Sequence, residues 1–380
     1  MSRHTESMNR ARRRRTISWI ACACSVVMAS GIAHGRADDA WRVFRGNAEL
    51  TGTANIEIPS APEPRWVFSA EDSIESSAAI ADGRVFVGSL DGRLYALDLD
   101  SGAELWRFET DIEIRSSPSV FGDTVYFGDE SGTFHALDVE SGAERWSYQT
   151  GGGIVSAANY ADGLLIFGSY DNHLYAVAAT DGTLVWSIET GGYVNGTPAI
   201  VGDTVISVGC DGVLRLVSLR DGALLGSIEI GAYVAASPAI SQGVAYFGTY
   251  ENQVLAVSLA GERRWAYEHP KRKFPYYSSA AITDGVLVVG GRDKMVHGID
   301  PATGGPLWTH TSGARVDSSP VIVGDRVFVG GSSGDLVALD VRSGEVLWQF
   351  ETGSSIVASP SLASGRLIIG TEDGDLYCFG

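Results

Sequence analysis

Five polar side chains share one position of a repeated motif and could together form a site. The position lies three residues before the proline of a Ser-Ser-Pro motif, or before the residue that replaces this proline. Its polar occupants are Glu75, Arg115, Asn195, Tyr277 and Asp317. Carboxylate and amide oxygens are the ligands that Ca²⁺ prefers, and a mouth lined in this way is polar enough to hold a small ligand. The alternative is a solvated pore without a ligand.

Other residue types that carry chemistry do not assemble into a recognisable motif. His135 and His297 stand where Tyr95 stands in its own copy of the repeat, which favours a packing role for both. The metalloprotease pattern His-Glu-x-x-His does not occur. Cys210 and Cys378 are the only cysteines after residue 37, and we expect them not to be bonded to each other. No catalytic residue, cofactor-binding residue or metal ligand is predicted.

A second group of basic and aromatic side chains falls on loops of the same face. An insertion at residues 269–277 is the one departure of several residues from the regular spacing of the chain. Tyrosine and arginine are enriched at protein contact surfaces, so we predict a partner-binding face here. The alternatives are a solvated loop and tyrosines that stack on a carbohydrate or an envelope polymer. The residues are Tyr170, Tyr193, Tyr233, Tyr250, Lys271, Arg272, Lys273, Phe274, Tyr276, Arg292 and Arg315.

The elements that must position these residues are defined by a repeat of about 40 residues. Tryptophan recurs at steps of 40, 40, 40, 40, 39, 43 and 40 residues, if Gly226 is counted at the position where one tryptophan is missing. Such a period indicates one supersecondary unit copied many times, whose copies must stack to bury their apolar faces. The tryptophans are Trp66, Trp106, Trp146, Trp186, Trp265, Trp308 and Trp348.

Each copy is predicted to contain four short antiparallel strands. Runs of β-branched and aromatic residues are separated by turn dipeptides such as Asp91-Gly92 and Asp373-Gly374, and no apolar period of 3.6 is present. Eight Ser-Ser-Pro positions predict an all-β propeller with eight four-stranded antiparallel blades. The last copy ends after three strands, and residues 64–68 form a fourth strand without a blade. We therefore expect the N- and C-terminal strands to pair and close the ring.

The motif Ala-x-Asp-x-x-x-Gly-x-x-x-Trp occurs at Ala96, Asp98, Gly102 and Trp106. It resembles the pyrroloquinoline-quinone (PQQ) repeat, and the resemblance covers residues 64–380. That family contains quinone-dependent dehydrogenases and non-catalytic eight-bladed scaffolds such as BamB. The resemblance to the BamB-like branch implies a protein-interaction scaffold of the cell envelope, with no enzyme activity and no cofactor. The alternatives are a PQQ-dependent dehydrogenase that uses Ca²⁺ and a propeller that binds carbohydrate.

The dehydrogenase alternative lacks several features that the family resemblance implies. Those enzymes carry long insertions that roof the site, whereas nearly every loop here is short. Many also place two adjacent cysteines beside the quinone, and no adjacent pair exists after residue 37. Glu75, Asn195 and Asp317 belong to blades too far apart to bind one Ca²⁺ together. We therefore expect the scaffold.

Residues 1–37 differ from the rest of the chain and predict an export signal. Four arginines at 12–15 precede an apolar run, so the segment is either cleaved or retained as a membrane anchor. Removing its seven basic and one acidic residues from totals of 28 and 46 leaves 21 basic and 45 acidic residues. An acidic body does not favour nucleic acid. Residues 38–63 are predicted to form a strap, and the product is expected to be a monomeric propeller in the periplasm or cell envelope.

Overall fold

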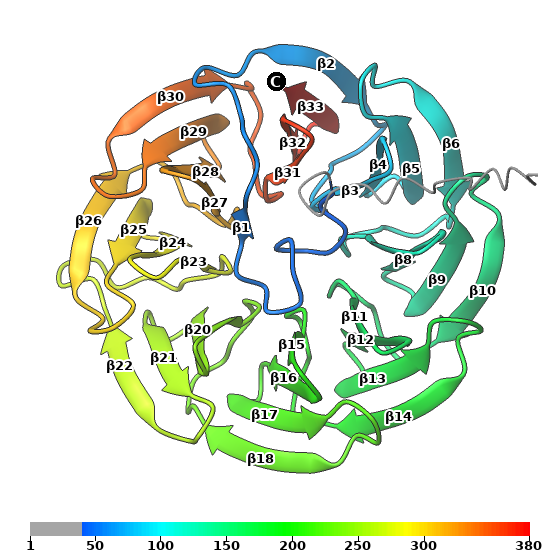
Figure 1. Ribbon diagram of the computed structural model, residues 1–380, viewed down its shortest axis with the longest axis horizontal. Helices are drawn as coiled ribbons and strands as arrows, with labels where there is room; N and C mark the ends of the chain where they lie inside the picture. The colour runs from blue at the N-terminus through cyan, green and yellow to red at the C-terminus, as the bar shows by residue number, and fades with distance from the viewer. Residues whose placement is uncertain (1–39) are drawn as a thin grey trace, which may run out of the picture. The chain divides into compact units, whose positions relative to one another are not determined.

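The computed structural model describes residues 40–380 and confirms an all-β propeller with eight blades. The predicted export signal lies outside the described residues. Figure 1 shows the blades arranged in a ring around a central axis, in chain order from β3 to β33. Within residues 40–380, no helix has the length and apolar character that crossing a membrane requires.

Each blade contains four antiparallel strands, numbered here in chain order. Two strands come before blade 1, β1 (Thr53–Ala54) and β2 (Pro64–Ser69). Blades 1 to 4 contain β3 (Ala79–Ala81), β4 (Arg84–Gly88), β5 (Arg93–Asp98), β6 (Glu104–Glu109), β7 (Ser119–Phe121), β8 (Thr124–Gly128), β9 (Thr133–Asp138), β10 (Glu144–Gln149), β11 (Asn159–Ala161), β12 (Leu164–Gly168), β13 (His173–Ala178), β14 (Leu184–Glu189), β15 (Ala199–Val201), β16 (Thr204–Val208), β17 (Val213–Ser218) and β18 (Leu224–Glu229). Blades 5 to 8 contain β19 (Ala239–Ser241), β20 (Val244–Gly248), β21 (Val254–Ser258), β22 (Arg263–Tyr267), β23 (Ala281–Ile282), β24 (Leu287–Gly291), β25 (Met295–Ile299), β26 (Pro306–Thr311), β27 (Val321–Val323), β28 (Arg326–Gly330), β29 (Asp335–Asp340), β30 (Val346–Glu351), β31 (Ser361–Ala363), β32 (Arg366–Gly370) and β33 (Asp375–Phe379).

The outermost strand of a blade differs from the inner three because only one of its faces is covered. Strands β3 to β5 are almost entirely buried, whereas β6 alternates and turns Trp106 and Phe108 inward. The link before β6 is closed by Asp98, whose Oδ1 accepts hydrogen bonds from the amide and hydroxyl of Ser101 at 2.9 and 2.6 Å. Gly102 follows with a positive φ of 71°, which glycine adopts readily. The repeated Asp and Gly of the motif therefore shape this turn.

In six of the eight joints, the repeated tryptophan packs on a glycine of the next blade. Trp106 donates from Nε1 to the carbonyl of Val139 at 2.9 Å, and its ring lies on Gly142 of blade 2. A Cβ at Gly142 would come within 2.6 Å of that ring, so the motif glycine is also required by close packing. The same ring-on-glycine contact recurs for Trp66, Trp146, Trp186, Trp265 and Trp308.

The joint between blades 4 and 5 lacks this contact. Gly226 lies where the tryptophan of blade 4 would stand, and a Cβ there would meet only Leu216, at 3.5 Å or more. The receiving link in blade 5 is also one residue shorter, because its closing hydrogen bond joins Ser258 to Glu262 instead of spanning five residues as in blade 1. Both halves of the contact are therefore absent.

The two ends of the propeller complete one blade, which confirms the predicted closure. Strand β2 pairs antiparallel with β33, and the order in this sheet is β2-β33-β32-β31. Trp66 faces Cys378 across the pair. Because β2 covers the free edge of β33, this closure limits association through an exposed strand edge.

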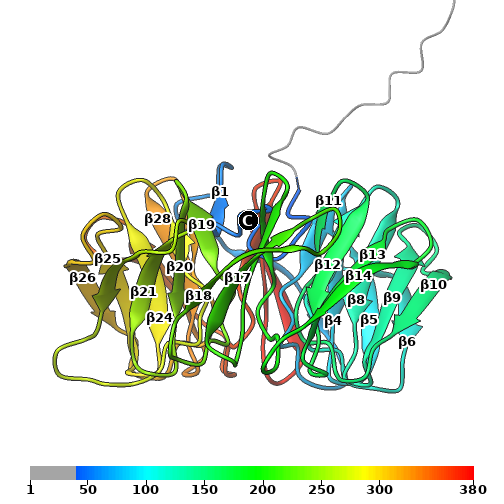
Figure 2. The ribbon, with the colours of Figure 1, turned by 90° about the horizontal axis from the view of Figure 1, so that it is seen from below.

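Residues 41–59, called the strap below, cross the middle of the ring on one face (Figures 1 and 2). Amides at matching positions of six inner strands donate to strap carbonyls, from Ile80 bonded to Trp41 through to Ile322 bonded to Gly52. Asn159 donates to the carbonyl of Ala48 for blade 3. Strand β1 of the strap also pairs in parallel with β27. The strap therefore contacts the blades one after another, in chain order.

The strap buries one arginine without a carboxylate partner. Arg45 is 1% exposed, and its guanidinium donates to the carbonyls of Ser319, Ala280 and Pro320. Burial lowers the pKa of Arg45 to about 9. Gly52 lies directly against this guanidinium, where no side chain would fit. These buried hydrogen bonds join the strap to blades 6 and 7.

Candidate functional site

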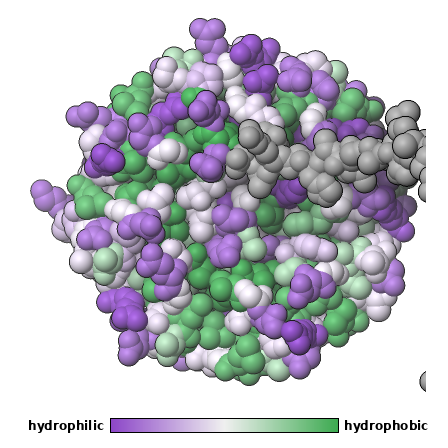
Figure 3. Space-filling model, in the orientation of Figure 1, coloured by the Kyte–Doolittle hydropathy of each residue, from purple (hydrophilic) through white to green (hydrophobic). Residues whose placement is uncertain are grey.

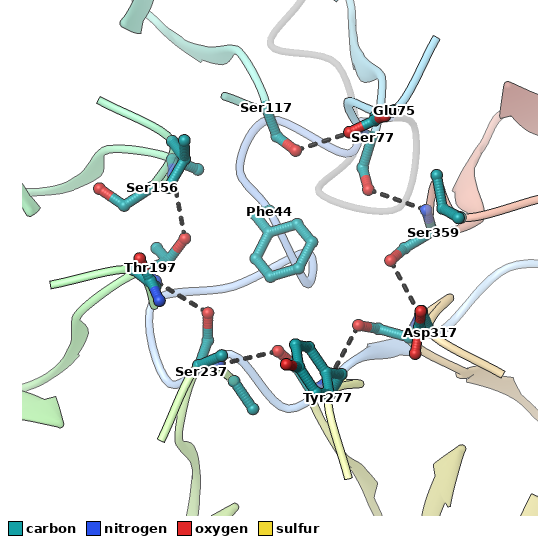
Figure 4. Close-up of a pocket in the computed structure, with 18 residues that line it drawn as sticks. Phe44, Glu75, Ser77, Ser117, Ser156, Thr197, Ser237, Tyr277, Asp317 and Ser359 are labelled. Atoms are coloured by element: carbon teal, nitrogen blue, oxygen red, sulfur yellow. Dashed lines mark hydrogen bonds between the residues drawn. The ribbon is translucent and has the colours of Figure 1, made fainter. Parts of the chain in front are cut away.

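The strap closes one end of the central channel and turns it into a pocket with a single mouth. In the space-filling view of the strap face, the middle of the ring is filled with atoms (Figure 3). Phe44 projects from the strap into the centre of the channel and forms the floor of the pocket (Figure 4). The pocket volume is about 200 Å³. The other face, which carries the hairpins between the second and third strands, is called the open face below.

Hydroxyl groups form a belt around this pocket. In seven of the eight blades, a backbone N–H donates to a hydroxyl of the following blade at 2.8 to 3.1 Å. The acceptors are Ser77, Ser117, Thr197, Ser237, Ser279, Ser319 and Ser359 (Figure 4). Ala157 has no hydroxyl, so the link from Ser117 to blade 3 lacks its acceptor. The second hydroxyl of the Ser-Ser-Pro motif therefore has a structural role, because it links neighbouring blades around the axis.

The structure brings four of the five predicted mouth residues to one pocket. Glu75, Asn195, Tyr277 and Asp317 line it. Arg115 is not among its lining residues but pairs with Glu75, which is.

Arg115 is the centre of an acidic cluster on blades 1 and 2. Besides Glu75, it pairs with Glu113 at 2.8 Å and Glu130 at 3.1 Å. Burial raises the pKa of Glu130; Arg115 opposes this shift, and the nearby Glu113 and Glu75 add to it. One guanidinium thus serves three carboxylates, and the cluster keeps a negative charge.

Tyr277 and Asp317 belong to a second cluster, on blades 6 and 7. Arg292 donates to both carboxylate oxygens of Asp317 at 2.9 and 3.0 Å, while its guanidinium lies 3.4 Å from the centre of the Tyr277 ring. Tyr250 packs against Tyr277 with ring centroids 4.6 Å apart. Arg315 reaches Asp317 at 3.5 Å. Both arginines therefore already have a carboxylate partner.

Asn195 and Cys210 lie together on blade 4. The amide of Asn195 donates to Cys210 Sγ at 3.3 Å, and its Oδ1 is buried without a hydrogen-bond partner. Burial raises the pKa of the Cys210 thiol. Both cysteines of the described chain are free thiols, and Cys378 is buried in β33.

The structure contradicts one residue of the predicted partner-binding face. Tyr276 is 2% exposed and packs in the core between blades 5 and 6, where its backbone crowds Gly248. The alternation of buried and exposed residues within the insertion was not visible from its sequence. Arg272 is exposed at its tip but donates to the carbonyl of Asp293, and Lys273 pairs with Glu268 at 3.0 Å. Lys271 and Phe274 remain exposed.

Tyrosines on blades 3 to 5 reach the open face to different extents. Tyr193 and Tyr233 are 51% and 60% exposed. Tyr170 stacks on Tyr193 with ring centroids 4.8 Å apart, and burial raises the pKa of Tyr170 to about 12. Glycines precede both exposed rings in sequence, at residues 191–192 and 231.

The two histidines in question form buried hydrogen-bonded pairs. His135 contacts Asp129 at 3.2 Å and Glu144 at 2.9 Å. His297 contacts Asp293 and the hydroxyl of Tyr267 and is fully buried.

Residues 330–334 match the Gly-x-Ser-x-Gly pattern of serine hydrolases. They form the hairpin between β28 and β29, however, and not the strand-to-helix turn that this pattern needs.

The mouth residues do not fit a quinone held with Ca²⁺. Anionic groups of such a cofactor would need cations, yet each arginine of the two clusters already pairs with a carboxylate. Across residues 40–380, no group of three or more acidic, histidine or cysteine side chains is arranged to hold a metal ion.

The pocket residue that was not predicted from the sequence is Phe44 of the strap. The aromatic residues around it, from Trp41 to Phe44, indicated a packed segment but not a pocket floor.

Comparisons with known proteins match both an assembly-factor family and a dehydrogenase. A family described as outer membrane protein assembly factor BamB matches residues 54–150, 90–273 and 254–379. BamB from Moraxella catarrhalis has a similar structure, with a TM-score of 0.70, 18% identity, and coverage of 84% of this chain and 97% of that chain. The quinohemoprotein alcohol dehydrogenase from Comamonas testosteroni has a TM-score of 0.77 at 14% identity, with coverage of 91% and 81%.

The computationally designed protein Ika8 is also similar, with a TM-score of 0.73, 17% identity, and coverage of 82% of this chain and 97% of that chain. No curated protein matches the sequence. At these identities the solved structures establish the shared fold alone.

Proposed function

Because the chain belongs to the family of the outer membrane protein assembly factor BamB, we propose that it is an exported, non-catalytic scaffold that binds a protein partner in the cell envelope. The partner binds the open face. The strap fills the middle of the opposite face, which leaves the open face as the side from which the pocket is reached.

The observation that carries this proposal is the division of the open face into three sectors. Two exposed tyrosines on blades 3 to 5 separate an acidic sector from a basic one. The acidic sector, on blades 8, 1 and 2, exposes Glu71, Asp72, Asp111, Glu113 and Asp373. The basic sector, on blades 6 and 7, exposes Lys271, Arg272, Lys273, Lys294 and Arg315. A face of this kind orients a partner of complementary charge, and exposed tyrosines anchor it.

The mouth supports a scaffold more than an oxidoreductase. Its arginines are paired, and the pocket of about 200 Å³ is smaller than the roughly 300–1,000 Å³ typical of sites for organic ligands. We therefore propose that catalysis by a bound quinone is not the function of this chain. Titration with pyrroloquinoline quinone and Ca²⁺, followed by tryptophan quenching and dye-linked oxidation of alcohols, tests this point; saturable binding with turnover would overturn it.

Site-specific photo-crosslinking tests the proposed face directly. A benzophenone amino acid at Tyr233 should form a discrete adduct with an envelope protein when the variant is produced in cells. The matched control is the same amino acid at Arg220, on the strap-face link of blade 4, whose side chain is 76% exposed. Adducts of equal yield from both positions would contradict the proposal. A Tyr193→Ser, Tyr233→Ser variant should also lose the adduct formed from Lys271.

A further inference from the structure

In five of the eight joints between neighbouring blades, a pair of rings packs below the open face. One ring comes from the outer strand of a blade and the other from the third strand of the next blade. The centroids lie 4.9 to 5.9 Å apart, and the rings meet edge to face at 61° to 64°. The pairs are Phe68–Tyr95, Phe108–His135, Tyr148–Tyr175, Tyr267–His297 and Phe350–Tyr377.

The joint between blades 6 and 7 has only one of the two rings. His310 of β26 takes the outer position, but Val337 of β29 stands where the neighbouring blades place tyrosine or histidine. A valine lacks the volume of an aromatic ring, and a pocket of about 110 Å³ lies in this joint. Comparison with the five joints that hold two rings, which include both joints next to this one, thus identifies the missing group as one ring.

The pocket walls suit an aromatic ring. Its inner part is formed by four buried valines, Val296, Val316, Val329 and Val337. The side chain of His310 presents a ring at the outer edge, in the position from which Phe108 and Tyr148 make edge-to-face contacts. An apolar cavity on the order of 150 Å³ binds benzene. The pocket here is smaller, at about 110 Å³, but it is open at its rim, so a ring can enter without lying wholly inside it.

Polar atoms at the rim match the needs of a phenol. In blades 1 and 3 the tyrosine hydroxyl donates to a hairpin carboxylate, Tyr95 to Asp91 and Tyr175 to Asp171, each at 2.7 Å. In blade 7 Ser333 takes the position of Asp91 and Asp171, and the carboxylate that lines the pocket is Asp335, the first residue of β29. Asp335 accepts from Gln349 at 2.8 Å and from Ser333 at 2.7 Å. A carboxylate has capacity for further donors. The pocket therefore offers an acceptor at its rim.

We propose that this pocket binds one aromatic ring, supplied by a tyrosine or phenylalanine side chain of the protein partner. The pocket lies on the open face, between Ser312 and Gly331 and beside Arg315 of the basic sector. A single free ring binds with a dissociation constant on the order of 1 mM, since few atoms are buried, so useful affinity requires a ring attached to a larger binding surface. The inference rests on the proposed function for its partner, but the pocket is testable alone.

The probe is p-cresol, the side-chain analogue of tyrosine, titrated into the purified protein while the valine methyl NMR signals are followed. Saturable shifts confined to the valines of the pocket are expected, with a dissociation constant on the order of 1 mM. Val337→Tyr supplies the missing ring from within and should weaken p-cresol binding at least tenfold. Val346→Tyr, on the exposed edge of the same blade, is the matched control and should bind p-cresol as the wild type does.

The reverse substitution makes the test symmetrical. Tyr175→Val removes the ring from the filled joint between blades 2 and 3 and should create a second p-cresol site there. No p-cresol binding by the wild type, or unchanged binding by Val337→Tyr, would overturn the proposal.

Photo-crosslinking separates this inference from the proposed function. Val337→Tyr should reduce the yield of the adduct formed from Tyr233 at least fivefold. An adduct of unchanged yield would leave the partner-binding face standing and would refute the partner's side chain as the occupant. If benzophenone at Tyr233 gives no adduct while Val337 is unchanged, the proposed function is refuted. The p-cresol titration would still decide whether the pocket takes a ring.

Discussion

The joints on the two sides of blade 4 are built differently. Toward blade 3, Trp186 is buried, donates to the carbonyl of Leu219 at 2.8 Å, and covers Gly222. Toward blade 5, Gly226 offers no ring. Near the axis, however, both joints keep a hydroxyl link, from Ala157 to Thr197 and from Thr197 to Ser237. The joints of this propeller are therefore held independently at the axis and at the rim, and between blades 4 and 5 only the rim contact is lost.

The rim contact should be the stronger of the two, and removal of its ring tests this most directly. Trp186→Ala should lower the free energy of unfolding by about 3–5 kcal/mol, because a buried tryptophan leaves a large cavity. Leu225→Ala, at an exposed site on the neighbouring outer strand, is the control and should change it by less than about 0.5 kcal/mol. Urea denaturation measures both. An equal effect of the two substitutions would remove the basis of the comparison.

The receiving glycine should matter nearly as much as the ring. Gly222→Ala should cost about 2–4 kcal/mol, since its φ is 69° and a new Cβ would come within 2.9 Å of Trp186. Gly243→Ala separates the two causes, because Gly243 has a φ of 73° and no atom within 4 Å of a Cβ. Its cost should stay near the backbone contribution of about 1–2 kcal/mol. Thermal denaturation of both variants gives the difference, which is the packing contribution.

At the joint without a tryptophan, the hydroxyl link should carry more of the stability than elsewhere. Ser237→Ala removes the acceptor of the buried Thr197 amide and should cost about 1–3 kcal/mol. Hydrogen exchange of β18 should rise in this variant more than exchange of β14, where Trp186 still holds the rim. Equal increases in the two strands would show that the joints do not differ in this way.

The smallest effect is expected where the hydroxyl belt is already interrupted. Ala157→Ser adds the missing acceptor for the amide of Ser117 and should raise the free energy of unfolding by about 0.5–1.5 kcal/mol. Ala158→Ser, at the buried next residue before β11, serves as the control and should destabilise, because it adds a hydroxyl without a repeated partner. Chemical denaturation distinguishes the opposite signs.

The repeat made most of the fold predictable. Its tryptophans, turn glycines and strand composition act over short sequence distances, so the blades and their closure could be inferred. The strap could not be placed in the same way, because it has no period and its contacts are distant; Arg45 bonds to Pro320 across 275 residues. Tyr276 was assigned to the surface because an insertion has no aligned copy from which burial can be read. The position three before the proline did identify side chains that line one pocket, since the ring places equivalent residues around one axis.

The strap also imposes an order on biogenesis. It is synthesised before any blade, yet its acceptors and donors lie on strands that extend to β28. At roughly 5–20 residues per second, the 275 residues between Arg45 and Pro320 take roughly 15–55 s to follow. During this interval the guanidinium of Arg45 lacks its native acceptors on blades 6 and 7, although Trp41 can already bond to Ile80 of blade 1. The first segment of the propeller to be made is thus among the last to be completed, and this interval is a period when the chain needs protection from aggregation.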